Sequence, residues 1–324
     1  MKFLYILVHS SEGFYIEQTY ISMLSLRQVS PNAHIVLLVD DCTFQKENNF
    51  FLESIKELAN ECRIITIPSD LPAVAKSRHI KTSMRLYIDE TFLYVDSDTI
   101  WLNPIDERDF TFDIMGVLDG HCLFSESNNK KSFEHLFDKI KCNPQTDYYI
   151  NSGVLFSRDS DYSRQIFSEW HEKWLQTSKN GIYVDQPSLN YILSKRNLSE
   201  DILLPGEYNC QITNSWDYFF KAKIIHYFSS NSNKNNRFDC PYLLQQQSFW
   251  EHLRNKANSF KTEEIIDNPL ALFEKGFTVK TAAARDFEES RIYGFAKDLY
   301  TRKISGQKSK FDFIEKILSY ISKE

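Results

Sequence analysis

Phe92-Leu-Tyr-Val-Asp-Ser-Asp-Thr-Ile-Trp-Leu-Asn-Pro104 places two carboxylates at the end of an apolar run. The run 92–95 has the pattern of a strand that is buried on both faces. Asp96 and Asp98 follow it, and burying an acidic pair there is costly without a partner of opposite charge. Mg²⁺ and Mn²⁺ prefer oxygen ligands, and Mg²⁺ is usually held by carboxylates together with substrate phosphates. The stretch therefore predicts a divalent cation that binds a nucleoside diphosphate, with an ordinary polar turn as the alternative.

The residues before this stretch alternate between apolar runs and helical patterns, which is typical of a parallel α/β sheet with crossover helices. We expect strands at 3–8, 34–39, 63–67 and 92–95, with helices near 15–29, 44–60 and 77–89. In such sheets, ligands bind beyond the carboxyl ends of the strands. The polar residues that fall at this edge are His9, Ser10, Asp40, Asp41, Asp96 and Asp98.

The second half of the chain continues the sheet and then becomes helical. Apolar runs at 112–118, 149–156 and 223–228 are separated by helical patterns at 162–176 and 186–195. From about residue 245 the sequence is helical and charged. We therefore predict an α/β domain over residues 1–240, with a mixed sheet flanked by helices, and a C-terminal helical extension over 241–324.

Composition and charge exclude several classes of protein. The 324 residues carry a formal net charge of -6, whereas proteins that bind nucleic acids usually carry a clustered basic surface, so no nucleic-acid partner is expected. The N-terminal apolar run is interpreted as a strand and not as a signal peptide, and no stretch approaches the roughly 20 apolar residues of a membrane span. These features predict a cytoplasmic protein. The last forty residues mix aromatic and basic residues, which fits peripheral contact with the inner face of a membrane or helices packed on the domain or a partner.

A basic stripe precedes the acidic pair. Arg78, Lys81 and Arg85 are spaced three and four residues apart, so a helix from Ser77 would carry them on one face. Such a stripe is suited to diphosphate oxygens, and Arg85, with its planar guanidinium, is the preferred candidate. The alternative is a solvated helix face.

Three later motifs have both a functional and a structural interpretation. Asn151, in a polar step before Gly153, either offers its amide to a sugar hydroxyl or belongs to a bulge. Asp185 is a candidate site residue, or simply the N-cap of a helix with Pro187 in its first turn. His226 ends a strand before the polar run 229–236, and it is either a structural histidine or a ligand of a Mn²⁺-like ion.

Taken in order, these motifs resemble the GT-A fold nucleotide-sugar glycosyltransferases, most closely the family 8 type that includes glycogenin and bacterial lipopolysaccharide galactosyl- and glucosyltransferases. The resemblance covers roughly residues 1–230. The motifs that carry it are Arg85-Leu86, Tyr94-Val-Asp96-Ser-Asp98, Asn151-Ser-Gly153-Val154, Asp185-Gln186-Pro-Ser-Leu189-Asn190 and Ile225-His226-Tyr227. The resemblance implies an α/β, Rossmann-like GT-A fold.

The resemblance also implies roles for individual residues. Asp96, Asp98 and His226 would be ligands of Mn²⁺ or Mg²⁺. The residues expected at the donor, a nucleotide sugar and in particular a UDP-sugar, are His9, Ser10, Tyr15, Asp40, Arg85 and Ser97. Asn151, Asp185 and Gln186 would form the catalytic face toward the transferred sugar and the acceptor. One departure concerns the lysine that family members place after the late histidine, because here the nearest candidate is Lys234.

The predicted reaction is metal-dependent transfer of a sugar to a hydroxyl acceptor, such as a glycan or a polysaccharide precursor, with retention of configuration. An inverting GT-A transferase that uses a carboxylate as general base is the first alternative. A non-catalytic nucleotide-sugar-binding protein is the second, since a fold does not fix a function. A sugar-1-phosphate nucleotidyltransferase is disfavoured, because the turn after the first strand is poor in glycine.

Overall fold

The structure is a computed structural model, and it describes residues 1–11, 13–68, 70–127, 129–196, 200–213, 217–228, 242–255, 262–273, 287 and 290–304. The chain forms two compact units, Met1–Phe277 and Thr278–Glu324, which are described separately. The domain boundary predicted at residue 240 therefore falls inside the first unit. Helix α8 (Gln247–Asn255) lies beyond that boundary, yet its Trp250 and Leu253 are buried in the main core of the first unit.

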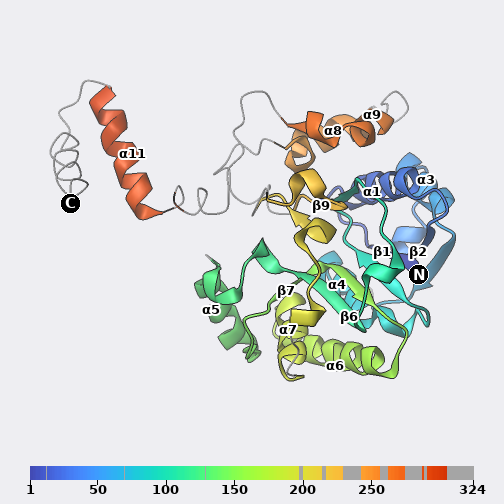
Figure 1. The fold of residues 1–324 in the computed structure, drawn as a ribbon. Coiled ribbons are helices and arrows are strands. Elements are labelled where there is room, and N and C mark those ends of the chain that lie inside the picture. Colours follow the sequence, from blue (N-terminus) through green and yellow to red (C-terminus); the bar gives the residue numbers. More distant parts are fainter. Residues whose placement is uncertain are drawn as a thin grey trace. The chain divides into compact units, whose positions relative to one another are not determined.

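A six-stranded mixed sheet forms the centre of the first unit (Figure 1). Its strand order is β3-β2-β1-β4-β7-β6, and the first four strands are parallel while β7 runs antiparallel to both of its neighbours. The strands are β1 (Lys2–Leu7), β2 (His34–Asp40), β3 (Glu61–Ile65), β4 (Phe92–Val95), β6 (Ile114–Leu118) and β7 (Ile150–Ser157).

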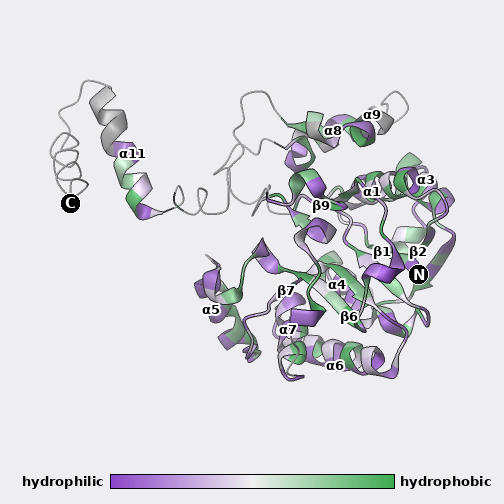
Figure 2. Cartoon of the chain, viewed as in Figure 1, coloured by the Kyte–Doolittle hydropathy of each residue, from purple (hydrophilic) through white to green (hydrophobic). Residues whose placement is uncertain are grey.

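Helices cover both faces of this sheet, because alternate residues of its central strands enter two separate cores. Tyr5 and Leu37 lie in the core that α1 and α3 complete, whereas Leu4 and Val36 lie in the core that α4, α6 and α7 complete. Figure 2 shows hydrophobic and hydrophilic residues mixed along α6, as expected for a helix that buries one side. The helices of this unit are α1 (Tyr15–Val29), α2 (Asp41–Phe44), α3 (Phe50–Leu58), α4 (Ala73–Ser83), α5 (Lys130–Ile140), α6 (Asp161–Ser178), α7 (Gln186–Ser194), α8 and α9 (Thr262–Asp267).

A smaller, three-stranded sheet includes the strand that directly follows the acidic pair in the sequence. It has the order β5-β9-β8, with β5 (Thr99–Trp101), β8 (Cys210–Gln211) and β9 (Ile224–His226). Asp96, Ser97 and Asp98 therefore form the link between the large sheet at β4 and the small sheet at β5. In the register of β5 and β9, Thr99 is paired with His226. This pairing brings a histidine that is far away in the sequence next to the acidic pair.

The sequence predicts the elements around the acidic pair well, with one consequential difference. Helix α1 has the predicted bounds, and β4 covers the predicted run. Helix α4, in contrast, begins at Ala73 and ends at Ser83, and a 3-10 turn at Met84–Leu86 follows it. The predicted helix ran on to residue 89. Arg78 and Lys81 therefore share the helix, whereas Arg85 lies beyond its end.

The second unit is described through Phe287 and the segment 290–304. Helix α11 (Arg291–Ile304) carries Ile292 and Phe295, whose side chains are largely exposed. Residues 305–324 of the predicted C-terminal extension lie outside the described residues. Among the helices that the structure describes, none has the length and apolar character needed to cross a membrane.

Candidate active site

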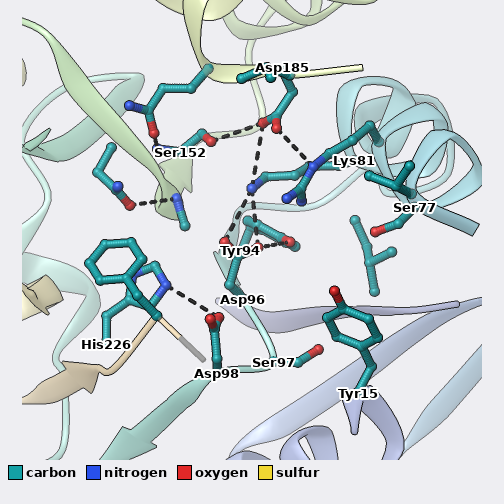
Figure 3. A pocket seen from close by; sticks show the side chains of 18 of the residues that line it. Tyr15, Ser77, Lys81, Tyr94, Asp96, Ser97, Asp98, Ser152, Asp185 and His226 are labelled. Atoms are coloured by element: carbon teal, nitrogen blue, oxygen red, sulfur yellow. Dashed lines mark hydrogen bonds and ion pairs between the residues drawn. The ribbon is translucent and has the colours of Figure 1, made fainter. Parts of the chain in front are cut away.

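A cavity of about 360 Å³ opens at the carboxyl ends of β1 and β4, and it contains the acidic pair. Figure 3 shows its side chains arriving from the β1–α1 region, α4, the β4–β5 link, β7, the start of α7 and the end of β9. Its lining includes Ser10, Tyr15, Arg78, Lys81, Asp96, Ser97, Asp98, Asp119, Asn151, Gly153, Asp185, Gln186, His226 and Phe228. The topology thus gathers most of the predicted site residues in one place.

Asp96, Asp98 and His226 form a group that fits a metal ion. One ligand atom from each residue lies within 4.8 Å of the others, and His226 Nε2 is 3.2 Å from Asp98 Oδ1. The His226 ring is buried, and its Nε2 has no hydrogen-bond partner among the described residues, because the contact with Asp98 lacks hydrogen-bonding geometry. A buried imidazole nitrogen that faces two carboxylates is a favourable donor for a divalent cation. The residues present therefore fit a metal.

The other nitrogen of His226 is held by a chain of amides. His226 Nδ1 lies 3.0 Å from Asn209 Oδ1, and Asn209 Nδ2 donates to Asn151 Oδ1 at 3.0 Å. Because the Asn209 oxygen is an acceptor, this chain favours a proton on Nδ1 and leaves the lone pair of Nε2 directed at the carboxylates. Outer hydrogen bonds of this kind orient metal-binding histidines in known metal sites.

Gly153 provides the space in which these side chains meet. A Cβ atom at this position would lie 2.4 Å from His226 Cε1 and 2.8 Å from Asp96 Oδ2. The Gly153 carbonyl also accepts a hydrogen bond from the Asp96 backbone N–H at 2.7 Å. The glycine is therefore required by close packing around the acidic pair.

Two cations from α4 pair with carboxylates of the pocket, and one of them, Lys81, links Asp96 to Asp185. Lys81, with a side chain only 1% exposed, places Nζ 3.1 Å from Asp96 Oδ1 and 3.5 Å from Asp185 Oδ2. Arg78 Nε lies 3.0 Å from Asp185 Oδ1. Figure 3 shows Lys81 between the two carboxylates, with Tyr94 hydrogen bonded to Asp96 below it. Positive charge is thus built into the pocket from α4.

Asp185 occupies the N-cap position of α7, as one interpretation of the sequence predicted, but its side chain serves this ion network. Its side chain makes no capping hydrogen bond, and Oδ2 accepts one from Ser152 Oγ at 2.9 Å. Burial alone would raise the pKa of its carboxyl, but the charges of Lys81 and Arg78, with the Ser152 hydrogen bond, hold that pKa below its usual value. Asp185 is therefore a fixed negative charge at neutral pH.

Asp119 is a pocket residue that the sequence interpretation missed. It directly follows β6, and Asn151 Nδ2 donates to its Oδ1 at 2.8 Å. Burial raises the pKa of its carboxyl, although hydrogen bonds from Asn151 and Gln186 oppose the rise. A carboxyl with a raised pKa is better suited to proton transfer than Asp185. The same signal that identified Asp96, an acid at the end of a buried strand, was available here.

Asn151 and Gln186 hold the pocket wall together. Besides its bonds to Asp119 and Asn209, Asn151 accepts a hydrogen bond from the Gly153 backbone N–H at 2.9 Å. Gln186 Oε1 accepts one from the Ser152 backbone N–H at 3.0 Å. Both amides thus face the cavity while orienting their neighbours.

Comparison with known proteins shows which protein family the chain belongs to. A model of the nucleotide-diphospho-sugar transferase family matches residues 76–260, more than half of the chain. The chain is a member of this family. The transferase is also similar in fold to a crystal structure of the galactosyltransferase LgtC in complex with donor and acceptor sugar analogues, with a TM-score of 0.50 and 15% identity over 81% of this chain and 98% of that chain. Among curated proteins, none matches the chain by sequence.

These findings confirm the GT-A α/β fold and identify the chain as a nucleotide-diphospho-sugar transferase, a family whose donor is a nucleotide sugar. They do not distinguish family 8 from its relatives, so that assignment stays a prediction.

In this transferase, Arg85 does not line the cavity, contrary to the prediction that it lies with Arg78 and Lys81. Its guanidinium donates to the backbone carbonyls of Ile88, Glu90, Ser157 and Arg158 and to the Ser157 hydroxyl, and it lies 4.3 Å from the centroid of the Phe92 ring. The reason is that α4 ends at Ser83, so that the 3-10 turn directs Arg85 away from the face that carries Arg78 and Lys81. Arg85 ties the segment before β4 to the end of β7.

The other predicted donor residues of the transferase divide into two groups. Ser10, Tyr15 and Ser97 line the cavity. His9 and Asp40 do not; the His9 backbone N–H donates to Thr43 Oγ1 at 2.7 Å, and the buried Asp40 Oδ1 has no hydrogen-bond partner among the described residues. Lys234 lies outside the described residues.

Proposed function

We propose that the protein transfers a sugar from a UDP-sugar to a hydroxyl group of a glycan or polysaccharide precursor, in the presence of Mn²⁺ or Mg²⁺. The observation that carries this proposal is the convergence of Asp96, Asp98 and His226 in a cavity that also contains Arg78 and Lys81. Carboxylates with an imidazole suit a divalent cation, and basic side chains suit a diphosphate.

The chain's own residues would hold the donor along the cavity. Asp96, Asp98 and His226 would hold the cation, which, when bound, supplies Lewis-acid stabilisation of the departing nucleoside diphosphate. Ser10 and Tyr15 lie toward β1 and would contact the nucleoside, as would His9 and Asp40 if the adjacent edge belongs to the site. Arg78 and Lys81 would balance the charge of the diphosphate oxygens.

Asp185, Gln186, Asn151 and Asp119 form the wall that would face the transferred sugar and the acceptor. We propose retention of configuration, which is supported by the resemblance to family 8. Asp185 supports the same proposal as a fixed anion, because an oxocarbenium-like transition state gains stabilisation from a nearby negative charge. Asp119 is the carboxyl better suited to accept a proton, and it is the candidate base if the reaction inverts.

The experiment is a panel of UDP-sugars incubated with the full-length protein and Mn²⁺, with release of UDP as the readout. The expected result is release that depends on Mn²⁺ and on one or a few sugars, and that is lost in an Asp96→Ala, Asp98→Ala double variant. Full activity in that variant would overturn the role of the acidic pair. The anomeric configuration of the product then separates retention from inversion, and binding without turnover would favour the non-catalytic alternative.

We extend the proposal to location in the cell: a cytoplasmic enzyme whose C-terminal region contacts the inner face of the membrane. The support is the exposed Ile292 and Phe295 of α11. Co-sedimentation of the full-length chain with anionic vesicles is the expected result, and its absence at low salt would favour packing on another protein surface instead.

A further inference from the structure

A row of buried hydroxyls on α1 contacts the segment that carries the acidic pair. Thr19, Ser22 and Ser25 are fully buried and spaced three residues apart, so they share one side of the helix. Thr19 Oγ1 is hydrogen bonded to Ser97 Oγ at 2.9 Å, Ser22 Oγ to Thr99 Oγ1 at 2.7 Å, and the Trp101 backbone N–H donates to Ser25 Oγ at 2.9 Å. The three hydroxyls thus contact residues 97, 99 and 101 in turn, one residue each.

The row continues to the backbone of Asp96 and to β1. Thr99 Oγ1 donates to the Asp96 backbone carbonyl at 2.8 Å. On the other side, Ser22 Oγ lies 3.1 Å from the Tyr5 hydroxyl, which accepts a hydrogen bond from Trp101 Nε1 at 2.8 Å. The segment that carries the acidic pair is therefore attached to α1 through several buried or partly buried hydrogen bonds.

This arrangement is more specific than core packing requires. The residues around the row, such as Ile21, Leu26 and Trp101, are fully buried and apolar. An apolar side chain at each hydroxyl position would fill the interface without the cost of burying a polar group. Hydrogen bonds add one property that apolar contacts lack, because a shift of α1 along β5 would break all of them together.

The same helix carries the nucleoside side of the pocket. Tyr15, its first residue, lines the cavity, and its backbone carbonyl accepts a hydrogen bond from Thr19 Oγ1 at 2.6 Å. Thr19 thus contacts both the start of α1 and the residue between the two acids. A nucleoside diphosphate bound to a metal must reach both regions at once, so their separation affects how well the two ligands bind together.

We propose that Thr19, Ser22 and Ser25 are positioning residues that fix the acidic pair relative to the nucleoside side of the pocket and thereby couple nucleotide binding to metal binding. This inference rests on the proposed function, because it takes UDP and Mn²⁺ as the ligands. It adds a source of cooperativity that lies in residues outside the metal group.

The test compares Thr19→Val with Thr177→Val. Both changes replace a buried helical threonine by an isosteric valine, and among the described residues the Thr177 hydroxyl donates only to the Trp174 carbonyl of its own helix, at 2.9 Å. UDP affinity is measured by calorimetry on the full-length chain, with and without Mn²⁺, and the coupling factor is the ratio of the two dissociation constants. Unfolding followed by tryptophan fluorescence gives the stability of each variant.

We expect Thr19→Val to lower the coupling factor by about fivefold to tenfold, the scale of its lost hydrogen bond to Ser97, while Thr177→Val leaves it within about twofold of the wild type. Thr19→Ser, which keeps the hydroxyl, should restore most of the coupling. Equal coupling factors in the two valine variants would overturn the inference even if both lose stability. If wild-type protein binds UDP no better with Mn²⁺ than without it, the proposed function fails instead. Ser22→Ala gives a second measurement, and an unchanged coupling factor there would also contradict the inference.

Discussion

Replacing Lys81 by methionine tests whether the buried ion network holds the pocket together. The Lys81 side chain is 1% exposed, and its ammonium group lies 3.1 Å from Asp96 and 3.5 Å from Asp185. At an effective dielectric constant of about 20, one such contact corresponds to roughly 5 kcal/mol of attraction before the cost of desolvating the lysine. Removing one partner of a buried ion pair costs about 3–5 kcal/mol, because it leaves an uncompensated charge.

We therefore expect Lys81→Met to lower the free energy of unfolding by about 3–5 kcal/mol and the melting temperature by roughly 10 °C at neutral pH. The assay is tryptophan fluorescence during thermal and guanidinium unfolding. All five tryptophans lie in the unit Met1–Phe277, so the signal reports only the unit that contains Lys81.

The matched control is Lys56→Met. Lys56 also contacts a carboxylate, with Nζ 2.9 Å from Glu53 Oε1, but this pair is much more exposed. An exposed ion pair contributes about 0.2–1 kcal/mol, so this variant should differ little from the wild type. A loss in Lys81→Met no larger than in Lys56→Met would refute the reasoning.

The pH dependence provides a second check. Because the folded-state pKa of Asp185 is lowered, its ionised form contributes stability that is present above its usual pKa of 3.8 and is lost as pH falls through the folded value. Without Lys81 that pKa should rise. The stability deficit of Lys81→Met should therefore be largest near pH 7 and should shrink as the pH approaches 4, since a protonated Asp185 needs no counter-charge. A deficit that is independent of pH would point to lost packing instead.

Three further variants test single elements of the site. Gly153→Ala should lower the rate of UDP release from the UDP-sugar by about a hundredfold or more, because the added Cβ would displace His226 and Asp96. Gly294→Ala, which has open space around it, is the control and should leave the rate of UDP release unchanged. Asn209→Ala should weaken Mn²⁺ binding by about tenfold to a hundredfold in a calorimetric titration, through loss of the bond that orients His226. Arg85→Met should destabilise the fold by about 2–4 kcal/mol and leave the KM for the donor unchanged; a raised KM with normal stability would restore Arg85 to the donor site.

Periodicity and strand ends were sufficient to predict the fold around the pocket. The buried run of β4 and the helical pattern of α1 are local signals, and each element lies where its pattern predicts. The acidic pair follows from β4 because the end of a buried strand in a parallel sheet is a fixed place. Its contact with His226 depends on the pairing of β5 with β9, a register that no local pattern contains.

The site residues that were misplaced or not predicted also depend on structure that local patterns do not show. Spacing alone placed Arg85 on the face of Arg78, since the sequence gives no clear stop at Ser83 and the change to a 3-10 turn moves every later side chain. Asn209 could not be found, because its role depends on two side-chain contacts with residues 17 and 58 positions away in the chain. Asp119 could have been found from its position after β6, had the rule for strand ends been applied to the antiparallel half of the sheet as well.

The charges of the pocket explain why a divalent cation and the donor would bind together. The described residues that line it include four carboxylates, Asp96, Asp98, Asp119 and Asp185, and two side-chain cations, Arg78 and Lys81. Both cations already contact Asp185 or Asp96, so a diphosphate entering alone would meet an excess of negative charge. Salt screens this charge poorly because the groups are buried or partly buried. Asp98→Asn removes one of these charges without adding bulk. In metal-free buffer this variant should therefore bind UDP more tightly than the wild type, whereas with Mn²⁺ it should bind UDP more weakly, because a metal ligand is lost. Weaker binding under both conditions would mean that Asp98 contacts the nucleotide directly and that charge balance does not govern this pocket.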